Sequence, residues 1–275
     1  MFAQNTKKDF STNALILVLL KRINKIAQLK IMKKIFKIIA VILLVIIVLL
    51  LGFSYFASKP IPHGERGSKA EALTNKIQLE INQKAWETTA AISFTFRGEH
   101  HYLWDKANNN VQVKWDGKTV IYNNQTLKGI AYDNDQLLTG DDKTATIKKA
   151  NDYFNNDSFW LVAPFKLRDL GTTRSIVKIG NQEALLVTYA SGGSTPGDSY
   201  LWLLDADDLP RAWQMWVGII PIGGIEASWE DWTTFPSGLR IATMHRGLFD
   251  LKLDNVKVGQ SVQQINDGNN PFTAL

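Results

Sequence analysis

YLWLLDADDLPRAWQMWV (residues 200–217) is the segment that most constrains the architecture of this chain. Two apolar runs flank an acidic turn, which is typical of neighbouring strands in an antiparallel sheet. The first run is apolar on both faces, and the second places Trp213 and Met215 on one face and Trp216 on the other. A sheet with one face in water carries a polar residue at every second position. Both faces of this sheet are therefore covered, or one of them lines a cavity.

Further strand patterns lie on both sides of this segment. The alternation of Ile92, Phe94 and Phe96 with smaller or polar residues predicts a half-buried strand. The other candidate strands are His100–Trp104, Val111–Trp115, Lys118–Tyr122, Ala184–Tyr189, Ile225–Trp229, Leu239–Met244 and Leu248–Leu253. The predicted turns are Asp116-Gly117, Ser191-Gly192-Gly193, Pro196-Gly197, Asp207-Asp208, Gly223-Gly224 and Pro236-Ser237-Gly238.

Helical patterns are few. Ser68 and Glu71 form a capping-box pattern, and an apolar residue at every fourth position then predicts one helix ending near Trp86. A second, short helix is predicted over Ala145–Phe154, ended by Asn155-Asn156-Asp157 before the apolar run Phe159–Pro164. Many strands, few helices and no βαβ alternation predict an α+β domain with a mostly antiparallel sheet.

A second feature is the uncharged run IIAVILLVIIVLLLGFSYFA, residues 38–57. As a helix it spans roughly 30 Å, enough for the hydrocarbon core of a bilayer. It is longer than a typical cleaved signal core, and Tyr55 stands where a cleavage site needs a small residue. We therefore favour an uncleaved anchor over a signal peptide. Met32-Lys33-Lys34 resembles the start of an exported protein, which raises the hypothesis that residues 1–31 are not translated.

Charge is distributed unevenly along the chain. Residues 1–58 hold nine Lys and Arg against one acidic residue, whereas residues 59–275 hold 22 against 25. The basic N-terminus predicts cytoplasmic retention by the positive-inside rule, and the remainder has no basic excess for nucleic acid. We expect a basic cytoplasmic segment over 1–37, an anchor over 38–57, a Pro- and Gly-containing linker over 58–67 and an extracytoplasmic domain over 68–275.

Aromatic residues are the candidate binding site. All nine tryptophans follow residue 58, and aromatic-lined cavities bind apolar ligands. The candidate pocket residues are Phe94, Phe96, Trp104, Trp115, Trp202, Trp213 and Trp216. Their expected role is apolar contact with a lipid or acyl chain. The alternative is a large, solid aromatic core without a ligand.

Two segments carry a resemblance to a known family. Leu204-Asp205-x3-Leu209-Pro210-x2-Trp213 resembles a strand-to-strand corner of the periplasmic outer-membrane lipoprotein carrier (LolA-like) family, formed by an aspartate, a turn and Leu-Pro. Trp229-Glu230-Asp231-Trp232-x2-Phe235-x2-Gly238-Leu239 resembles the family's segment of an aromatic strand followed by a glycine turn. The resemblance covers most of residues 68–255. It implies an incomplete antiparallel barrel, or half-barrel, closed by helices around a hydrophobic cavity that holds acyl chains. The retained anchor and the apolar run Phe159–Pro164 depart from the family pattern.

Catalytic and metal patterns are weak. With no cysteine, thiolate nucleophiles, thiolate metal sites and disulfides are excluded. His100 and His101 with Asp105 form the most ligand-like cluster, but neighbouring residues on a strand point to opposite faces. Asp205, Asp207 and Asp208 lack the spacing of a calcium loop, and Gly192–Gly197 lacks the lysine of a phosphate loop. We assign no catalytic residue, metal or cofactor.

These patterns favour a single-pass protein of the inner (cytoplasmic) membrane whose C-terminal domain lies in the periplasm. The domain is expected to bind a lipid or the acyl chain of a lipoprotein. The alternatives are an envelope hydrolase or a glycan-binding module using exposed tryptophans, and a purely structural interaction domain.

Overall fold

The computed structural model of the chain describes residues 5–191 and 196–275. It divides into two compact units, Met1–Ala57 and Ser58–Leu275, which are described separately. The predicted turn at Ser191-Gly192-Gly193 and the glycine-rich segment Gly192–Gly197 fall largely outside the described residues.

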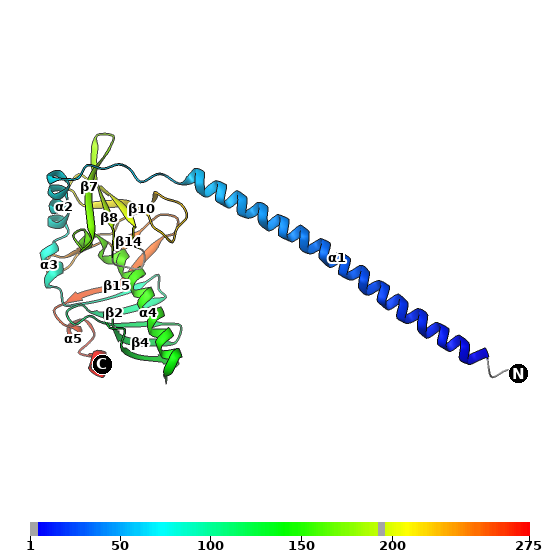
Figure 1. Cartoon of the computed structure of the whole chain (residues 1–275). Coiled ribbons are helices and arrows are strands. Elements are labelled where there is room, and N and C mark those ends of the chain that lie inside the picture. Colours follow the sequence, from blue (N-terminus) through cyan, green and yellow to red (C-terminus); the bar gives the residue numbers. More distant parts are fainter. Residues whose placement is uncertain (1–4, 192–195) are drawn as a thin grey trace. The chain divides into compact units, whose positions relative to one another are not determined.

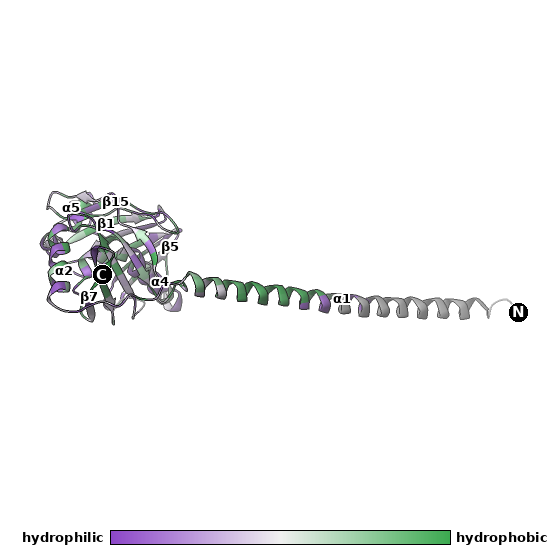
Figure 2. Cartoon of the chain, turned by 90° about the horizontal axis from the view of Figure 1, so that it is seen from above, coloured by the Kyte–Doolittle hydropathy of each residue, from purple (hydrophilic) through white to green (hydrophobic). Residues whose placement is uncertain are grey.

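The first unit is one helix, α1 (Asn5–Ala57). Its part Met32–Ala57 has 26 residues and is long and apolar enough to cross a membrane. Figure 2 shows most of the coloured part of α1 in green, the colour of hydrophobic residues. At 1.5 Å per residue this part measures about 39 Å, more than a hydrocarbon core of about 30 Å. The N-terminal apolar helix is thus confirmed. A membrane span and a signal sequence both have these properties.

The second unit contains two large antiparallel sheets (Figure 1). The first has the order β14 (Met244–His245), β15 (Leu251–Gly259), β1 (Ala91–Phe96), β2 (His100–Asp105), β3 (Asn110–Trp115), β4 (Lys118–Asn123), β5 (Gly129–Asp133) and β6 (Gln136–Leu137). The second has the order β11 (Ile225–Ser228), β10 (Pro210–Trp216), β9 (Ser199–Leu204), β8 (Gln182–Tyr189) and β7 (Thr172–Ile179). Strands β12 (Thr233–Thr234) and β13 (Arg240–Ile241) form a small ribbon.

The two large sheets are joined at one edge. The backbone N–H of Ser228 donates to the carbonyl of Arg246 over 2.8 Å, and that of Glu230 donates to Met244 over 2.9 Å. These bonds connect the end of β11 to β14, whereas β6 and β7, at the far edges, are not paired to each other in the described residues. The predicted α+β class with an antiparallel, unclosed barrel is therefore confirmed.

Helix α4 (Gly140–Val162) packs against one face of both sheets, which we call the inner face. The sequence predicted a short helix over Ala145–Phe154 that ends at Asn155-Asn156-Asp157. Both the length and the end are wrong, because a single helix of 23 residues runs through this triplet and includes Phe159. The polar triplet does not end the helix because Asp157 points inward, where Tyr102 and His100 satisfy its carboxylate. A short 3₁₀ turn, Ala163–Lys166, follows.

The predicted helix from Ser68 to Trp86 is two helices, α2 (Ser68–Glu80) and α3 (Gln83–Thr88). Asn82 between them adopts a left-handed conformation with φ of 58°, and its side chain accepts a hydrogen bond from the Ala85 N–H at 3.1 Å. The capping box is also wrong. Gly67 is the N-cap of α2, and Glu71 instead accepts hydrogen bonds from Arg168 and Arg174.

The remaining elements close the ends of the sheets. Helix α5 (Val262–Ile265) packs on β1, β2 and β15, and a 3₁₀ turn, Pro271–Ala274, lies near β3 and β4. Helix α2 covers β7 and β8. The main core therefore lies between the inner face of the sheets and helices α2 and α4.

Candidate functional site

The pairing of β9, β10 and β11 positions an aromatic wall on the inner face. Trp202 pairs with Trp213 across β9 and β10, and Trp213 pairs with Ala227 on β11. Residues directly opposite each other on antiparallel strands project to the same face, so both indole rings point toward α4. Trp229 follows β11 and joins them, while Phe159 and Trp160 contact them from α4.

These side chains pack directly on one another. Ring centroids lie 5.0 Å apart for Trp202 with Trp213, 5.0 Å for Trp213 with Trp229 and 5.0 Å for Trp160 with Trp213. Trp202 is 0% exposed and Trp213 is 1% exposed. We call this group the aromatic core; its members are Phe159, Trp160, Tyr189, Tyr200, Trp202, Trp213, Trp229 and His245. Rings from α4 and the sheet fill the space where the sequence predicted a cavity.

Four more predicted residues lie on the eight-stranded part of the inner face. Phe94 stacks on Tyr102 at 4.6 Å, Trp104 contacts Phe154 at 5.1 Å, and Trp115 contacts Tyr153 at 5.6 Å. Phe96 belongs to the same buried cluster. Six of the seven predicted residues therefore share one core. They are Phe94, Phe96, Trp104, Trp115, Trp202 and Trp213.

Trp216 is the exception. It lies on the opposite, outer face of the five-stranded sheet, packed against a smaller apolar cluster that includes Leu201 and Leu203. Its indole N–H donates to the carbonyl of Lys59 over 2.7 Å. Trp216 thus holds the segment that follows α1 and does not line the inner face.

Several polar atoms in the main core have no partner among the described residues. These atoms are the indole nitrogens of Trp104, Trp202, Trp213 and Trp229 and the hydroxyl of Tyr189. Leaving a buried donor unpaired costs about 1–3 kcal/mol, and native interiors contain few such groups. Four of these five donors, all except that of Trp104, belong to the aromatic core.

His245 lies at the seam between the two sheets. Its Nδ1 lies 3.0 Å from the Ser228 carbonyl oxygen, and its ring packs 4.4 Å from that of Trp229. Burial lowers the pKa of His245 from 6.5 to about 4, against the opposing influence of the Ser228 and Trp160 carbonyls. The imidazole is consequently neutral at neutral pH.

A second polar group fastens α4 to β2, and sequence reasoning missed it. The Asp157 carboxylate accepts a hydrogen bond from the Tyr102 hydroxyl at 2.6 Å and lies 2.6 Å from His100 Nδ1. Burial and the neighbouring Asp157 raise the pKa of Tyr102 far above its usual value. An acidic residue two positions before an apolar run was the available signal, but nothing in the sequence identifies its partners.

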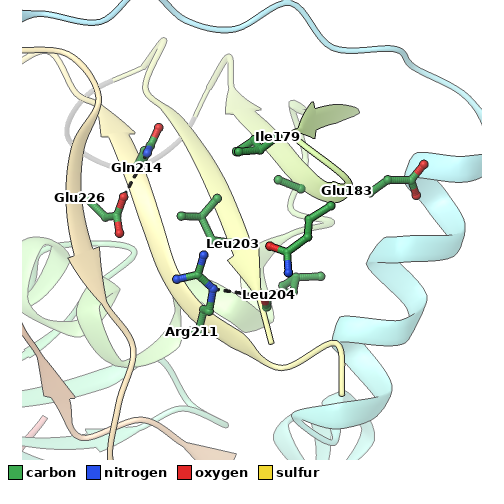
Figure 3. A pocket seen from close by; sticks show the side chains of 9 residues that line it. Ile179, Glu183, Leu203, Leu204, Arg211, Gln214 and Glu226 are labelled. Atoms are coloured by element: carbon green, nitrogen blue, oxygen red, sulfur yellow. Dashed lines mark hydrogen bonds between the residues drawn. The ribbon is translucent and has the colours of Figure 1, made fainter. Parts of the chain in front are cut away.

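Two hollows lie elsewhere on the described surface. One, of about 200 Å³, opens on the outer face of the five-stranded sheet near Arg211, Gln214 and Glu226 (Figure 3). Gln214 donates to Glu226 across it at 3.0 Å. The other, of about 350 Å³, lies between Pro196 and Trp216. Neither hollow contains the predicted inner-face residues.

The remaining candidate histidines and aspartates are not arranged as a catalytic or metal-binding group in the part of the chain that the structure describes. His100 faces Asp157, whereas His101 contacts Thr95 through Nδ1 at 3.1 Å. Asp205 caps its turn by accepting the N–H groups of Asp207 and Leu209, each at 2.9 Å. Among the described residues, no group of three or more His, Asp or Glu side chains is placed to bind a metal.

Comparisons with known proteins give a structural likeness but no match in sequence. No protein-family model and no curated protein matches the chain. A solved structure of a DUF1329 family protein from Desulfovibrio piger is similar to it, at 11% sequence identity and a TM-score of 0.37. The match covers 73% of this chain and 98% of that protein.

Proposed function

We propose that this chain is a membrane-anchored envelope protein whose outer domain binds the hydrocarbon of a lipid or a lipidated partner between the inner face and α4. In this proposal α1 crosses the inner membrane once and the second unit lies in the periplasm. The basic residues before the apolar run support that orientation.

The observation that carries the proposal is the aromatic core with its unpaired donors. Trp202, Trp213 and Trp229 offer a broad apolar wall and three indole N–H groups that have no acceptor among the described residues. A lipid acyl ester or carboxyl group matches this wall, because it combines hydrocarbon with acceptor oxygens. The LolA-like sequence resemblance supports the same ligand class.

Binding requires the C-terminal part of α4 to leave the wall, since Phe159 and Trp160 occupy it. Burying about a dozen methylenes at ~0.8 kcal/mol each gives roughly 10 kcal/mol relative to water. A lipid in a bilayer is already out of water, so the wall roughly matches the membrane. Exchange between protein and membrane is thus more consistent with these energies than tight storage.

Photo-crosslinking tests the proposal. Full-length protein is delipidated in detergent and mixed with a phosphatidylethanolamine that carries a diazirine on one acyl chain, and labelled peptides are mapped by mass spectrometry. We expect labelling of Phe159 and of the peptides containing Trp202, Trp213 and Trp229, with competition by unlabelled phospholipid. Labelling confined to α1 would contradict binding by the core.

The same experiment includes an oligosaccharide competitor. Of the nine tryptophans, all in described residues, five are buried and four half-buried, and none is exposed for stacking on a sugar ring. We therefore expect no competition by oligosaccharide. Loss of core labelling on its addition would favour the glycan alternative.

A further inference from the structure

The chain that follows α1 is docked on the second unit from its first residue. The Ser58 hydroxyl accepts the Gly223 N–H at 2.9 Å, the Lys59 N–H donates to the Gly223 carbonyl at 2.9 Å, and Trp216 binds the Lys59 carbonyl. Further on, Glu65 pairs with Ile176 at the edge of β7. The predicted linker 58–67 is thus held along the five-stranded sheet.

The residues docked in this way follow directly after the apolar helix in the chain. Ser58 is covalently next to Ala57, the last residue of α1, and consecutive Cα atoms are about 3.8 Å apart. Gly223 belongs to the loop between β10 and β11, residues 217–224. Chain connectivity alone therefore keeps this loop close to the point where α1 ends.

The same loop presents apolar side chains to solvent. Its sequence is VGIIPIGG, and Ile219 is 69% exposed. The loop between β14 and β15, residues 246–250, carries Leu248 at 67% exposure and Phe249 at 74% exposure. Single exposed apolar residues are ordinary, but grouped ones mark an interaction surface.

Strand polarity brings these two loops to one end of the domain. The bonds from Ser228 to Arg246 and from Glu230 to Met244 make this segment antiparallel to β11. After Arg246 the chain therefore runs back toward Ile225, where the β10–β11 loop ends. A Cβ placed on Gly247 would lie 2.8 Å from the Glu226 carbonyl oxygen, which confirms the close approach.

We infer that Ile219, Leu248 and Phe249 form a membrane-contact surface that inserts into the lipid bilayer holding α1. A lipid surface is the occupant these observations favour, because the loops share one end of the domain with the residue that follows the anchor. The inference rests on the tethering part of the proposed function and is independent of ligand binding by the aromatic core.

Because the chain has no native cysteine, single cysteines give a clean test. Ile219→Cys, Phe249→Cys and a control, Leu137→Cys, are made in the full chain, labelled with the fluorophore NBD and reconstituted into phosphatidylethanolamine–phosphatidylglycerol vesicles. Leu137 is 58% exposed and lies on β6, seven strands from β14, or about 34 Å along the sheet.

We expect nitroxide-labelled lipids to quench NBD at 219 and 249, and aqueous iodide to quench it there several-fold less than at 137. Equal iodide quenching at all three positions would overturn the inference. Protection from iodide without quenching by nitroxide lipid would also overturn it, since a protein partner or a second copy would then cover the loops. Protein that fails to float with the vesicles refutes the tether itself, an outcome distinct from a failure of core labelling.

Discussion

Acidification is expected to destabilise the second unit through His245. This side chain is 0% exposed and lies where β14 meets the end of β11, between the rings of Trp229 and Trp160. Burial lowers its pKa to about 4 in the folded protein, while the unfolded chain has the ordinary value of 6.5. The unfolded state therefore binds a proton more readily between these two values.

The direction and the size of this change in stability with pH follow from proton linkage. The contribution of neutral His245 to the free energy of unfolding is complete above pH 6.5 and is lost as the pH falls toward 4. The difference between the two pKa values corresponds to about 3 kcal/mol. Because small domains have about 5–15 kcal/mol in total, this loss is a large fraction of stability.

Urea denaturation of the full chain in detergent, followed by tryptophan fluorescence, measures this effect. All nine tryptophans lie in the second unit, so the signal reports on its unfolding. His245→Gln is expected to be less stable at neutral pH but to lose less stability on acidification than the wild type, by about 3 kcal/mol. The control is His101→Gln, an exposed residue that should keep the wild-type pH profile. Parallel profiles for wild type and His245→Gln would refute the reasoning.

Three substitutions test other parts of the structure. Asp157→Ala should lower the free energy of unfolding in urea by about 3 kcal/mol, because it leaves Tyr102 and His100 without their buried acceptor. The exposed control Asp141→Ala should change this free energy by less than about 0.5 kcal/mol. Equal effects of the two substitutions would contradict a structural role for Asp157. Gly129→Ala should lower the free energy of unfolding by about 1–3 kcal/mol, because its Cβ would lie 2.2 Å from the Ile121 carbonyl oxygen. The control Gly218→Ala meets no such contact. An unchanged stability of Gly129→Ala would mean that β4 and β5 separate easily. Trp216→Phe should speed amide hydrogen exchange in residues 58–65, because it removes the N–H donor to the Lys59 carbonyl. The control is Trp232→Phe, which removes an N–H that donates to the Pro210 carbonyl and should leave this exchange unchanged. Unchanged exchange in Trp216→Phe would show that the segment is held without its bond to Trp216.

The strands were readable from the sequence because their alternation is local. The segment 200–217 forms β9 and β10 around the predicted turn, and its apolar character on both faces has a physical cause. Inner-face residues pack against α4, while Leu201 and Leu203 form a second apolar cluster on the outer face. Strand β7 (Thr172–Ile179), whose pattern is less apolar, was missed.

The helices were less predictable because distant residues determine their limits. Polar side chains usually weaken a helix interior, yet the partners of Asp157 lie on β2, 55 and 57 positions earlier in the chain. The break at Asn82 depends on its left-handed backbone conformation and on the hydrogen bond to Ala85. Helical periodicity contains no information on either contact.

At the candidate site too, the local features could be predicted from the sequence and the long-range contacts could not. Residue type and alternation grouped six aromatic residues that do share one core, but they gave no measure of how completely α4 fills the space. Trp216 was assigned to the pocket by residue type, although its strand position already placed it on the face opposite Trp213. The unpaired indole nitrogens could be found only from the three-dimensional packing.

The two proposals are linked by the energetics of lipid transfer. A hydrocarbon chain gains little on moving from bilayer to protein, but crossing water would expose it at a cost of ~0.8 kcal/mol per methylene. A domain held against the bilayer through Ile219, Leu248 and Phe249 would shorten that crossing without any gain in affinity. In the proposed function, the fastening of α4 by Asp157 would act in opposition, since it would keep the aromatic wall closed until a ligand replaced the helix. Membrane contact and helix fastening would therefore set the rate of exchange, while the aromatic core would set only its equilibrium.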